Sequence, residues 1–307
     1  MPRPIIIDTD PGIDDAVAIL LALASPELAV IGLIAVAGNL PLAATVQNAR
    51  RLVELAGRPE LPVYAGCPRP LGRNGVAAEE VHGDSGLGDL VLPPPTLLPL
   101  SEHGVLYLIE TLRRAAPNSI TLCALGPLTN IATALVMAPE IATAIAELVV
   151  MGGASHGRGN VTPAAEFNIF ADPLAAAIVF DCALPITLVP LDATEGVQST
   201  AAHIAPIRRL GTRCGAAVAG LLGPRRALGQ PPMAMHDPCV IAWLIAPHLF
   251  RGREANVAIE TASPLARGMT LIDWRGRSGR PANARVIEAI DAEGLYQLLA
   301  ERLANLP

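Results

Sequence analysis

The sequence predicts an α/β protein with a single open, mostly parallel, doubly wound (Rossmann-like) sheet, helices on both faces and additional C-terminal strands. Up to residue 190, short apolar runs of strand length alternate with longer helix-like segments, which is typical of a parallel sheet covered by helices. Of the 307 residues, 51% are hydrophobic and 16% are charged, so the chain can bury a large core. Because no repeat or linker interrupts the pattern, residues 1–307 are predicted to form one domain.

The first predicted strand is the isoleucine run at 5–7, which is apolar on both faces. Pro11-Gly12 predicts a turn, and an apolar helix is expected over 13–24. Further strands are expected at 28–35, 61–65, 120–125, 148–151 and 185–190, and further helices at 42–56, 103–115, from 126 onward and at 172–182. Beyond residue 190 we expect helices within 201–222 and at 239–245, strands at 257–260, 269–274 and 284–290, and a terminal helix from 292.

Two stretches rich in glycine, proline and polar residues, 66–100 and 152–170, are predicted to be irregular. The first is long for a connection inside a compact domain, so it is a candidate lid or binding loop.

The charge pattern excludes several classes of function. The formal net charge is −6, so no basic face is expected for nucleic acid or for an anionic membrane, and a small ligand is more natural. All 22 basic residues are arginines. The absence of lysine excludes Schiff-base chemistry and the phosphate-binding lysine of a P-loop.

The cysteines and the N-terminus indicate a cytoplasmic protein. Five cysteines form an odd set without close pairs, so neither a disulfide framework nor a zinc site is expected, and a reducing compartment fits best. The chain runs from Met1 directly into the first predicted strand, without a secretory segment or an apolar run long enough to span a bilayer.

Four carboxylates follow the first strand within eight residues: Asp8, Asp10, Asp14 and Asp15. They lie at the carboxyl end of a predicted strand, where open α/β sheets bind ligands. Acids this close repel one another and raise each other's pKa, so a bound divalent cation or a shared proton is expected. An acidic first helical turn would explain Asp14 and Asp15 alone, but it does not explain the other two.

Other polar residues also follow predicted strands. The carbonyl of Leu125 precedes Gly126-Pro127, and proline provides no local donor for it. Asn160, Glu166 and Asn168 lie in the second irregular stretch, where amides and a carboxylate could bind hydroxyl groups, but surface solvation is the more natural interpretation of this stretch taken alone.

Two histidines are candidates for chemistry. His236 precedes Asp237-Pro238, which resembles a helix cap with proline at the first helical position. His82 lies in the long loop, where a solvated histidine is the ordinary interpretation.

The segment Asp8-Thr9-Asp10-Pro11-Gly12-Ile13-Asp14-Asp15-Ala16 resembles the N-terminal signature of the inosine-uridine-preferring nucleoside hydrolases. The resemblance continues in the same order through 37–39, 63–67, 82–83, 126–130, 151–153, 160, 166–168 and 236–238. It therefore covers nearly the whole chain.

The resemblance implies calcium-dependent hydrolysis of the N-glycosidic bond of ribonucleosides in purine or pyrimidine salvage, by a homodimer or homotetramer. Ribose and free base would be the products, and metal-bound water the nucleophile. By position, calcium would be held by Asp10, Asp15, Asp237 and the Leu125 carbonyl, with Asp10 also the general base. The ribose would be held by Asp14, Asn39, the Met151 carbonyl, Asn160, Glu166 and Asn168. His82 and His236 would face the leaving base, with His236 as proton donor.

One departure from the family pattern leaves the base preference open. Members often place an aromatic residue before the His-Asp-Pro motif, whereas residues 221–235 contain none. Two alternative functions are a haloacid-dehalogenase-like phosphatase and a non-catalytic, calcium-stabilised ribose-binding module. The phosphatase would use Asp8 as nucleophile and Asp10 as general acid, but the lysine common in that class is absent.

Overall fold

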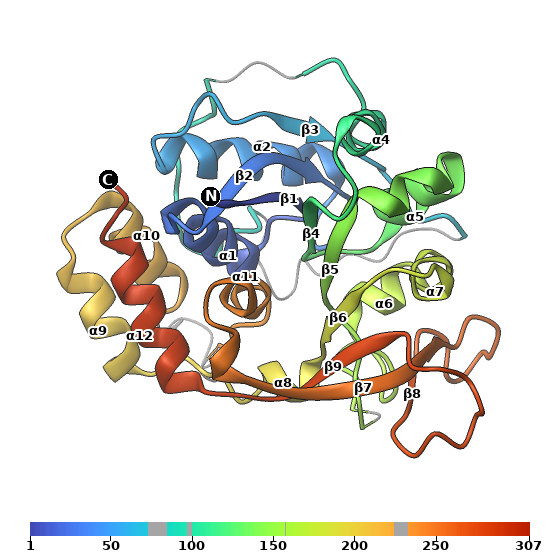
Figure 1. Ribbon diagram of the computed structural model, residues 1–307. Helices are drawn as coiled ribbons and strands as arrows, with labels where there is room; N and C mark the ends of the chain where they lie inside the picture. The colour runs from blue at the N-terminus through green and yellow to red at the C-terminus, as the bar shows by residue number, and fades with distance from the viewer. Residues whose placement is uncertain (73–84, 97–99, 157, 224–232) are drawn as a thin grey trace.

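The chain folds around one large, mostly parallel sheet (Figure 1). The computed structural model describes residues 1–72, 85–96, 100–156, 158–223 and 233–307. Within them the strand order is β3-β2-β1-β4-β5-β6-β9-β7-β8. Neighbours from β3 to β9 are parallel, whereas β7 is antiparallel to both β9 and β8. The predicted α/β class with additional C-terminal strands is therefore confirmed.

The strands are β1 (Arg3–Thr9), β2 (Leu28–Ala35), β3 (Val63–Ala65), β4 (Ile120–Ala124), β5 (Ile145–Met151), β6 (Ile186–Val189), β7 (Phe250–Ile259), β8 (Thr270–Asp273) and β9 (Ala284–Ile290). The α-helices are α1 (Ile13–Ala24), α2 (Leu42–Leu55), α4 (Gly104–Arg114), α5 (Thr129–Met137), α6 (Phe167–Ala171), α7 (Pro173–Asp181), α8 (Leu191–Thr194), α9 (Ala201–Arg209), α10 (Arg213–Leu221), α11 (Pro238–Ile245) and α12 (Ala292–Leu303). Two short 3₁₀ helices span Pro139–Ala144 and Pro247–Leu249.

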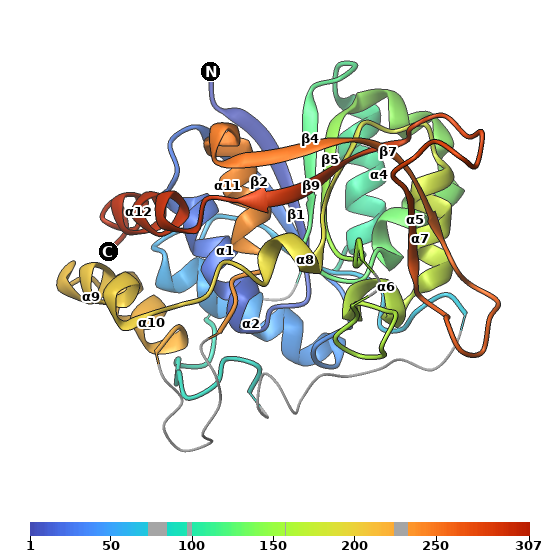
Figure 2. The same ribbon diagram turned by 90° about the horizontal axis from the view of Figure 1, so that it is seen from below.

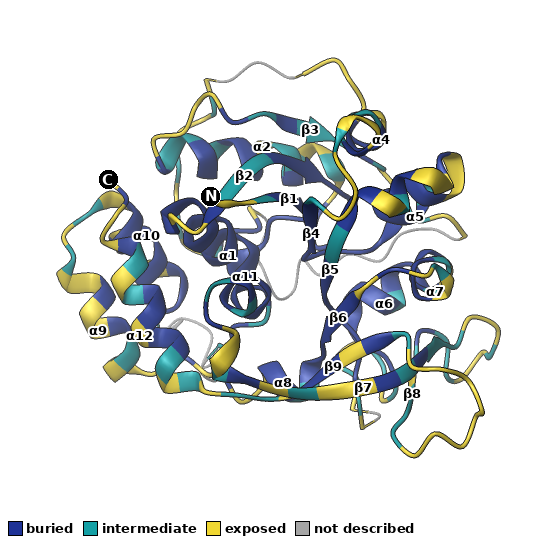
Figure 3. Cartoon of the chain, in the orientation of Figure 1, coloured by how far each residue is buried: buried dark blue, intermediate teal, exposed yellow. Residues whose placement is uncertain are grey.

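Helices cover both faces of the sheet. One face carries α1, α2 and α9 to α12, and the other carries α4, α5 and α7 (Figures 1 and 2). Each face of the sheet packs into its own hydrophobic core, and the isoleucines of β1 contribute to both. Ile5 and Ile7 pack with α1, whereas Ile6 packs with α4 and α5. All of α1 is buried, as Figure 3 shows, because it lies between the sheet and the outer helices α10 and α12. No helix among the described residues is long and apolar enough to cross a membrane.

Several predicted elements differ from the structure. Strand β5 begins at Ile145 instead of residue 148, and helix α8 follows β6 where no helix was expected. Residues 167–171 form helix α6 instead of continuing the irregular stretch, because the Glu166 side chain caps the first helical turn. Strand β7 begins at Phe250 instead of residue 257, and its first half exposes charged side chains while its backbone pairs with β9. The helix expected from Gly126-Pro127 begins at Thr129.

The parallel strands bring distant loops to one edge of the sheet. Asp8, near the end of β1, lies beside Ile34 of β2 and Ala124 of β4 in the strand register. The residues that follow these strands therefore meet at the carboxyl edge, together with α6 and α8, which follow β5 and β6.

Candidate active site

Asp15, in the first turn of α1, is held by four hydrogen bonds. The Thr9 hydroxyl donates to its Oδ1 at 2.5 Å, and the backbone N–H of Asp10 donates to the same oxygen at 3.3 Å. Its Oδ2 accepts from the Gly12 backbone N–H at 2.9 Å and from the Asn39 side-chain amide at 3.2 Å. The carboxylate of this fully buried residue is thus fixed in position by β1, by the turn and by the loop after β2.

Asp10 is also fully buried, but only one of its carboxylate oxygens is satisfied. Its Oδ2 accepts from the Asn39 backbone N–H at 2.6 Å, whereas Oδ1 has no hydrogen-bond partner among the described residues. Burial, and next the negative charge of Asp15, raise the pKa of Asp10. Two glycines make room for it: a Cβ at Gly38 would lie 2.1 Å from Oδ2, and one at Gly126 would lie 2.4 Å from Oδ1.

The carboxylates of Asp14 and Asp15, in the first turn of α1, come together with that of Asp237, the residue that precedes α11. One oxygen from each lies within 4.8 Å of the other two, and all three residues are buried. Burial, followed by the charges of Asp14 and Asp15, raises the pKa of Asp237 well above its ordinary value. A cation would relieve this repulsion. We call Asp10, Asp14, Asp15 and Asp237 the acid cluster.

The carboxylates that come within metal-ligand spacing include two of the predicted ligands, Asp15 and Asp237. The sequence grouped Asp10 with Asp15 and Asp237, whereas the three-carboxylate group with metal-ligand spacing contains Asp14 in its place. Asp10 lies beside this group, since its charge acts on Asp237.

Asn168, in α6, joins the ends of β4 and β5. Its side-chain amide donates to the Leu125 carbonyl at 2.7 Å and to the Met151 carbonyl at 3.2 Å. The Leu125 carbonyl, for which the sequence offered no local donor, thus accepts a hydrogen bond from a side chain 43 residues away.

Glu166 accepts three backbone hydrogen bonds. They come from Gly153 at 2.9 Å, Asn168 at 2.8 Å and Ile169 at 3.2 Å. Burial raises the pKa of Glu166 to about 7, although these bonds act in the opposite direction. Asn160, by contrast, is exposed, and its side-chain oxygen accepts from the Phe167 backbone N–H at 2.9 Å.

His236 is half-buried at the start of the His-Asp-Pro segment. Its Nδ1 lies 2.7 Å from the hydroxyl oxygen of Thr194 in α8. Burial lowers the pKa of His236, while the charges of Asp14 and Glu195 oppose that shift. His82 and residues 224–232, which include the arginines before the motif, lie outside the described part of the chain.

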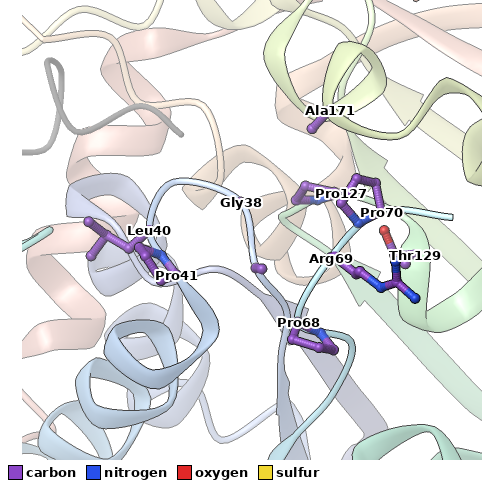
Figure 4. Close-up of a pocket in the computed structure, with 10 residues that line it drawn as sticks. Gly38, Leu40, Pro41, Pro68, Arg69, Pro70, Pro127, Thr129 and Ala171 are labelled. Atoms are coloured by element: carbon purple, nitrogen blue, oxygen red, sulfur yellow. The ribbon is translucent and has the colours of Figure 1, made fainter. Parts of the chain in front are cut away.

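A cavity of about 220 Å³ lies beside Asp10 (Figure 4). Gly38 and Pro127, which line it, also flank Asp10: a Cβ at Gly38 would lie 2.8 Å from the Pro127 ring. The rest of the lining includes Leu40, Pro41, Pro68, Arg69, Pro70 and Thr129.

Sequence reasoning did not identify the two threonines that bond to site residues. Thr9 stands inside the acidic motif, so its place between Asp8 and Asp10 was a usable signal. Thr194 lies 42 residues from His236 and carries no local signal.

Comparison with known proteins identifies the family of this chain. Residues 5–297 match the family described as inosine-uridine preferring nucleoside hydrolase. The chain is 45% identical to an uncharacterized protein (C1683.06c) of Schizosaccharomyces pombe and 43% identical to the pyrimidine-specific ribonucleoside hydrolase RihA of Salmonella paratyphi C, each alignment covering 99% of both chains. A solved inosine-guanosine nucleoside hydrolase superposes with a TM-score of 0.91 at 29% identity, over 100% of both chains. The chain belongs to the inosine-uridine preferring nucleoside hydrolase family and is therefore an enzyme that acts on N-glycosyl bonds.

Proposed function

We propose that this enzyme uses calcium at the acid cluster to hydrolyse ribonucleosides to ribose and free base. The observation that carries the proposal is the acid cluster itself: four buried aspartates, with Asp10 Oδ1 left without a partner among the described residues. Family membership does not favour the phosphatase or the non-catalytic ribose-binding module.

The residues present fit calcium. The donor set consists of carboxylate oxygens with backbone carbonyls nearby, and calcium takes six to eight such oxygens. Asp10, Asp15, Asp237 and the Leu125 carbonyl would hold the ion, and the close approach of Asp14 to Asp15 and Asp237 supports a cation there. When bound, calcium supplies positive charge that lowers the pKa of water and attracts sugar hydroxyls.

Asp10 serves as the general base in this proposal. Its Oδ1 is a buried carboxylate oxygen without a hydrogen-bond partner among the described residues, so it can accept a proton from the attacking water, while Oδ2 is held by the Asn39 backbone N–H. The carboxylate therefore keeps its orientation while it takes the proton.

The ribose is held by side chains on the same edge of the sheet. They are Asp14, Asn39, Asn160, Glu166 and Asn168, with the Met151 carbonyl. Because Glu166 and Asn168 are fixed by hydrogen bonds to β4, β5 and the loop after β5, they need little reorganisation when substrate binds. Negative charge around the sugar also stabilises the positive charge that develops on the ribosyl ring.

His236 protonates the leaving base, and His82 faces the base as well. A purine or pyrimidine anion is a poor leaving group at neutral pH, and an imidazole is suited to supply the proton. We further propose pyrimidine ribonucleosides as preferred substrates, because the relatives named pyrimidine-specific are 43% identical to this chain and the inosine-guanosine enzyme is 29% identical.

One panel of substrates tests these assignments. Uridine, cytidine, inosine, p-nitrophenyl riboside and p-nitrophenyl phosphate are incubated with the protein, and release of base or nitrophenol is measured. We expect ribosides to be cleaved, uridine or cytidine fastest among the nucleosides, and the phosphate to remain intact. Phosphate cleavage without riboside cleavage would overturn the proposal, and binding of ribose without turnover would support the ribose-binding module.

Three further properties stay predictions. We propose one domain over residues 1–307, because the described strands form one sheet. A cytoplasmic location and a homodimer or homotetramer are proposed from the sequence and the family resemblance.

A further inference from the structure

We propose that Thr194 is the positioning residue for His236. We also propose that helix α8 links His236 to the ribose end of the site, meaning Glu166 and the residues bonded to it. The inference rests on the proposed function, because it assigns His236 to the leaving base. It concerns a residue that the sequence did not single out, and it starts from the 2.7 Å contact between the Thr194 hydroxyl and His236 Nδ1.

The direction of this hydrogen bond follows from the proposed role of His236 and fits a second contact. The hydroxyl of Thr194 also lies 3.1 Å from the Leu191 carbonyl oxygen, which can only accept. An imidazolium that acts as proton donor carries a hydrogen on Nδ1, so the Thr194 hydroxyl oxygen must accept from Nδ1–H of His236. The single hydroxyl hydrogen then goes to the Leu191 carbonyl, which also accepts from the Glu195 backbone N–H at 2.8 Å. This arrangement fixes the ring with Nε2 toward the substrate. The imidazolium form gives its Nε2 proton to the leaving base and is left as the neutral ring with the proton on Nδ1.

The backbone places these two residues together without the help of the hydroxyl. The segment before His236 pairs with the segment after α8, because Met235 N–H donates to the Val197 carbonyl at 2.9 Å and Ser199 N–H donates to the Met233 carbonyl at 2.8 Å. Loss of the hydroxyl should therefore release the imidazole while the chain around it stays in place.

The same helix is tied to the ribose end. Leu191 N–H donates to the Gly153 carbonyl at 2.8 Å, and Gly153 N–H donates to Glu166 Oε2 at 2.9 Å. A continuous chain of hydrogen bonds thus runs from Glu166 through Gly153, Leu191 and Thr194 to His236. This chain fixes the position of His236, the proposed proton donor, relative to Glu166, the proposed ribose-binding carboxylate.

The test compares Thr194→Val with Thr194→Ser on two substrates. Valine keeps the shape of threonine but removes the hydroxyl, whereas serine keeps the hydroxyl. We expect Thr194→Val to lower kcat for uridine by about 10- to 100-fold, part of the contribution of general acid catalysis. Turnover of p-nitrophenyl riboside, whose leaving group needs no proton, should stay within about threefold of wild type. Serine should restore uridine turnover.

Two controls separate positioning from a general loss of structure. Thr187→Val removes a hydroxyl that is also buried but donates to Glu147 at 2.8 Å, and it should leave the ratio of the two substrates unchanged. In a His236→Ala background, Thr194→Val should add no further loss, because the residue acts through the imidazole. An equal loss on both substrates, or an additive loss in the double variant, would overturn the positioning role.

A measurement without substrate keeps this inference distinct from the proposed function. Imidazole ¹⁵N NMR spectra, assigned with His236→Asn, should show Nδ1 protonated in the wild-type protein, both in the imidazolium and in the neutral ring, and a loss of this preference for Nδ1 in Thr194→Val. A wild-type ring protonated at Nε2 alone would refute the bond direction even if nucleosides are cleaved. If the wild type cleaves neither riboside, the proposed function fails, whatever the NMR result.

Discussion

The carboxylate region, meaning Asp15 and Glu166, and the base end of the site, meaning His236 and its surroundings, differ in how firmly their side chains are held. Asp15 accepts four hydrogen bonds and Glu166 accepts three, mostly from backbone N–H groups. The described contacts of the His236 ring include one hydrogen-bonded hydroxyl, that of Thr194. Backbone donors at the ends of packed strands cannot move independently, whereas a single side-chain contact can be exchanged.

This difference suggests which part of the reaction each region controls. The rigid region suits cation and ribose binding, which all nucleosides require alike. In the proposed function the less constrained region faces the base, and relatives with this fold carry names that specify different bases. Perturbing each region separately tests whether the two regions control different steps of the reaction.

Metal removal should have the largest effect. Exhaustive chelation is expected to abolish nucleoside and p-nitrophenyl riboside turnover alike, because the acid cluster serves both substrates, and added calcium should restore both. Elemental analysis should find about one calcium per chain in active protein. Full turnover by protein shown to be free of divalent ions would contradict the proposed role of the acid cluster.

Removal of the ribose 2′-hydroxyl should lower efficiency by roughly 10⁴-fold or more, because a buried site built to bond a hydroxyl rejects the analogue that lacks it. The measurement is kcat/KM for uridine against deoxyuridine, and for inosine against deoxyinosine. Equal values within a pair would show that the region around Asp14 and Asn168 is not a ribose site.

Replacing His236 with Ala should lower turnover of natural nucleosides by about 10²- to 10⁴-fold and spare p-nitrophenyl riboside. The calcium and ribose sites stay in place, and p-nitrophenolate leaves without a proton. If both substrates slow equally, His236 instead supports Asp237, and the two regions are not separable.

Gly126→Ala should lower turnover of both substrates by about 100-fold, because its Cβ would lie 2.4 Å from Asp10 Oδ1 and must displace the general base. Gly220→Ala is the matched control in helix α10, where nothing lies within 4 Å of the added Cβ. It should keep full activity and stabilise the fold by about 0.5–1 kcal/mol in thermal unfolding. Unchanged activity in Gly126→Ala would show that Asp10 tolerates movement.

The local features of the fold could be predicted from the sequence. The ranges 13–24 and 28–35 agree with α1 and β2 at both ends. Turn residues mark these apolar runs in the sequence, with Pro11-Gly12 before α1 and Gly38-Asn39 after β2. The acidic motif likewise marked the edge of the sheet where the acid cluster lies, since Asp8 to Asp15 are neighbours along the chain.

Tertiary structure decided which of these residues meet. Asn39 reaches Asp10 and Asp15 across 29 and 24 residues, and Asn168 reaches the Leu125 carbonyl across 43. Such contacts depend on the order and register of the strands, which are determined by how both cores pack and not by any local pattern. The same reason explains why α6 and the first half of β7 were missed, since a side-chain cap and an antiparallel neighbour stabilise segments whose own sequence favours neither helix nor strand.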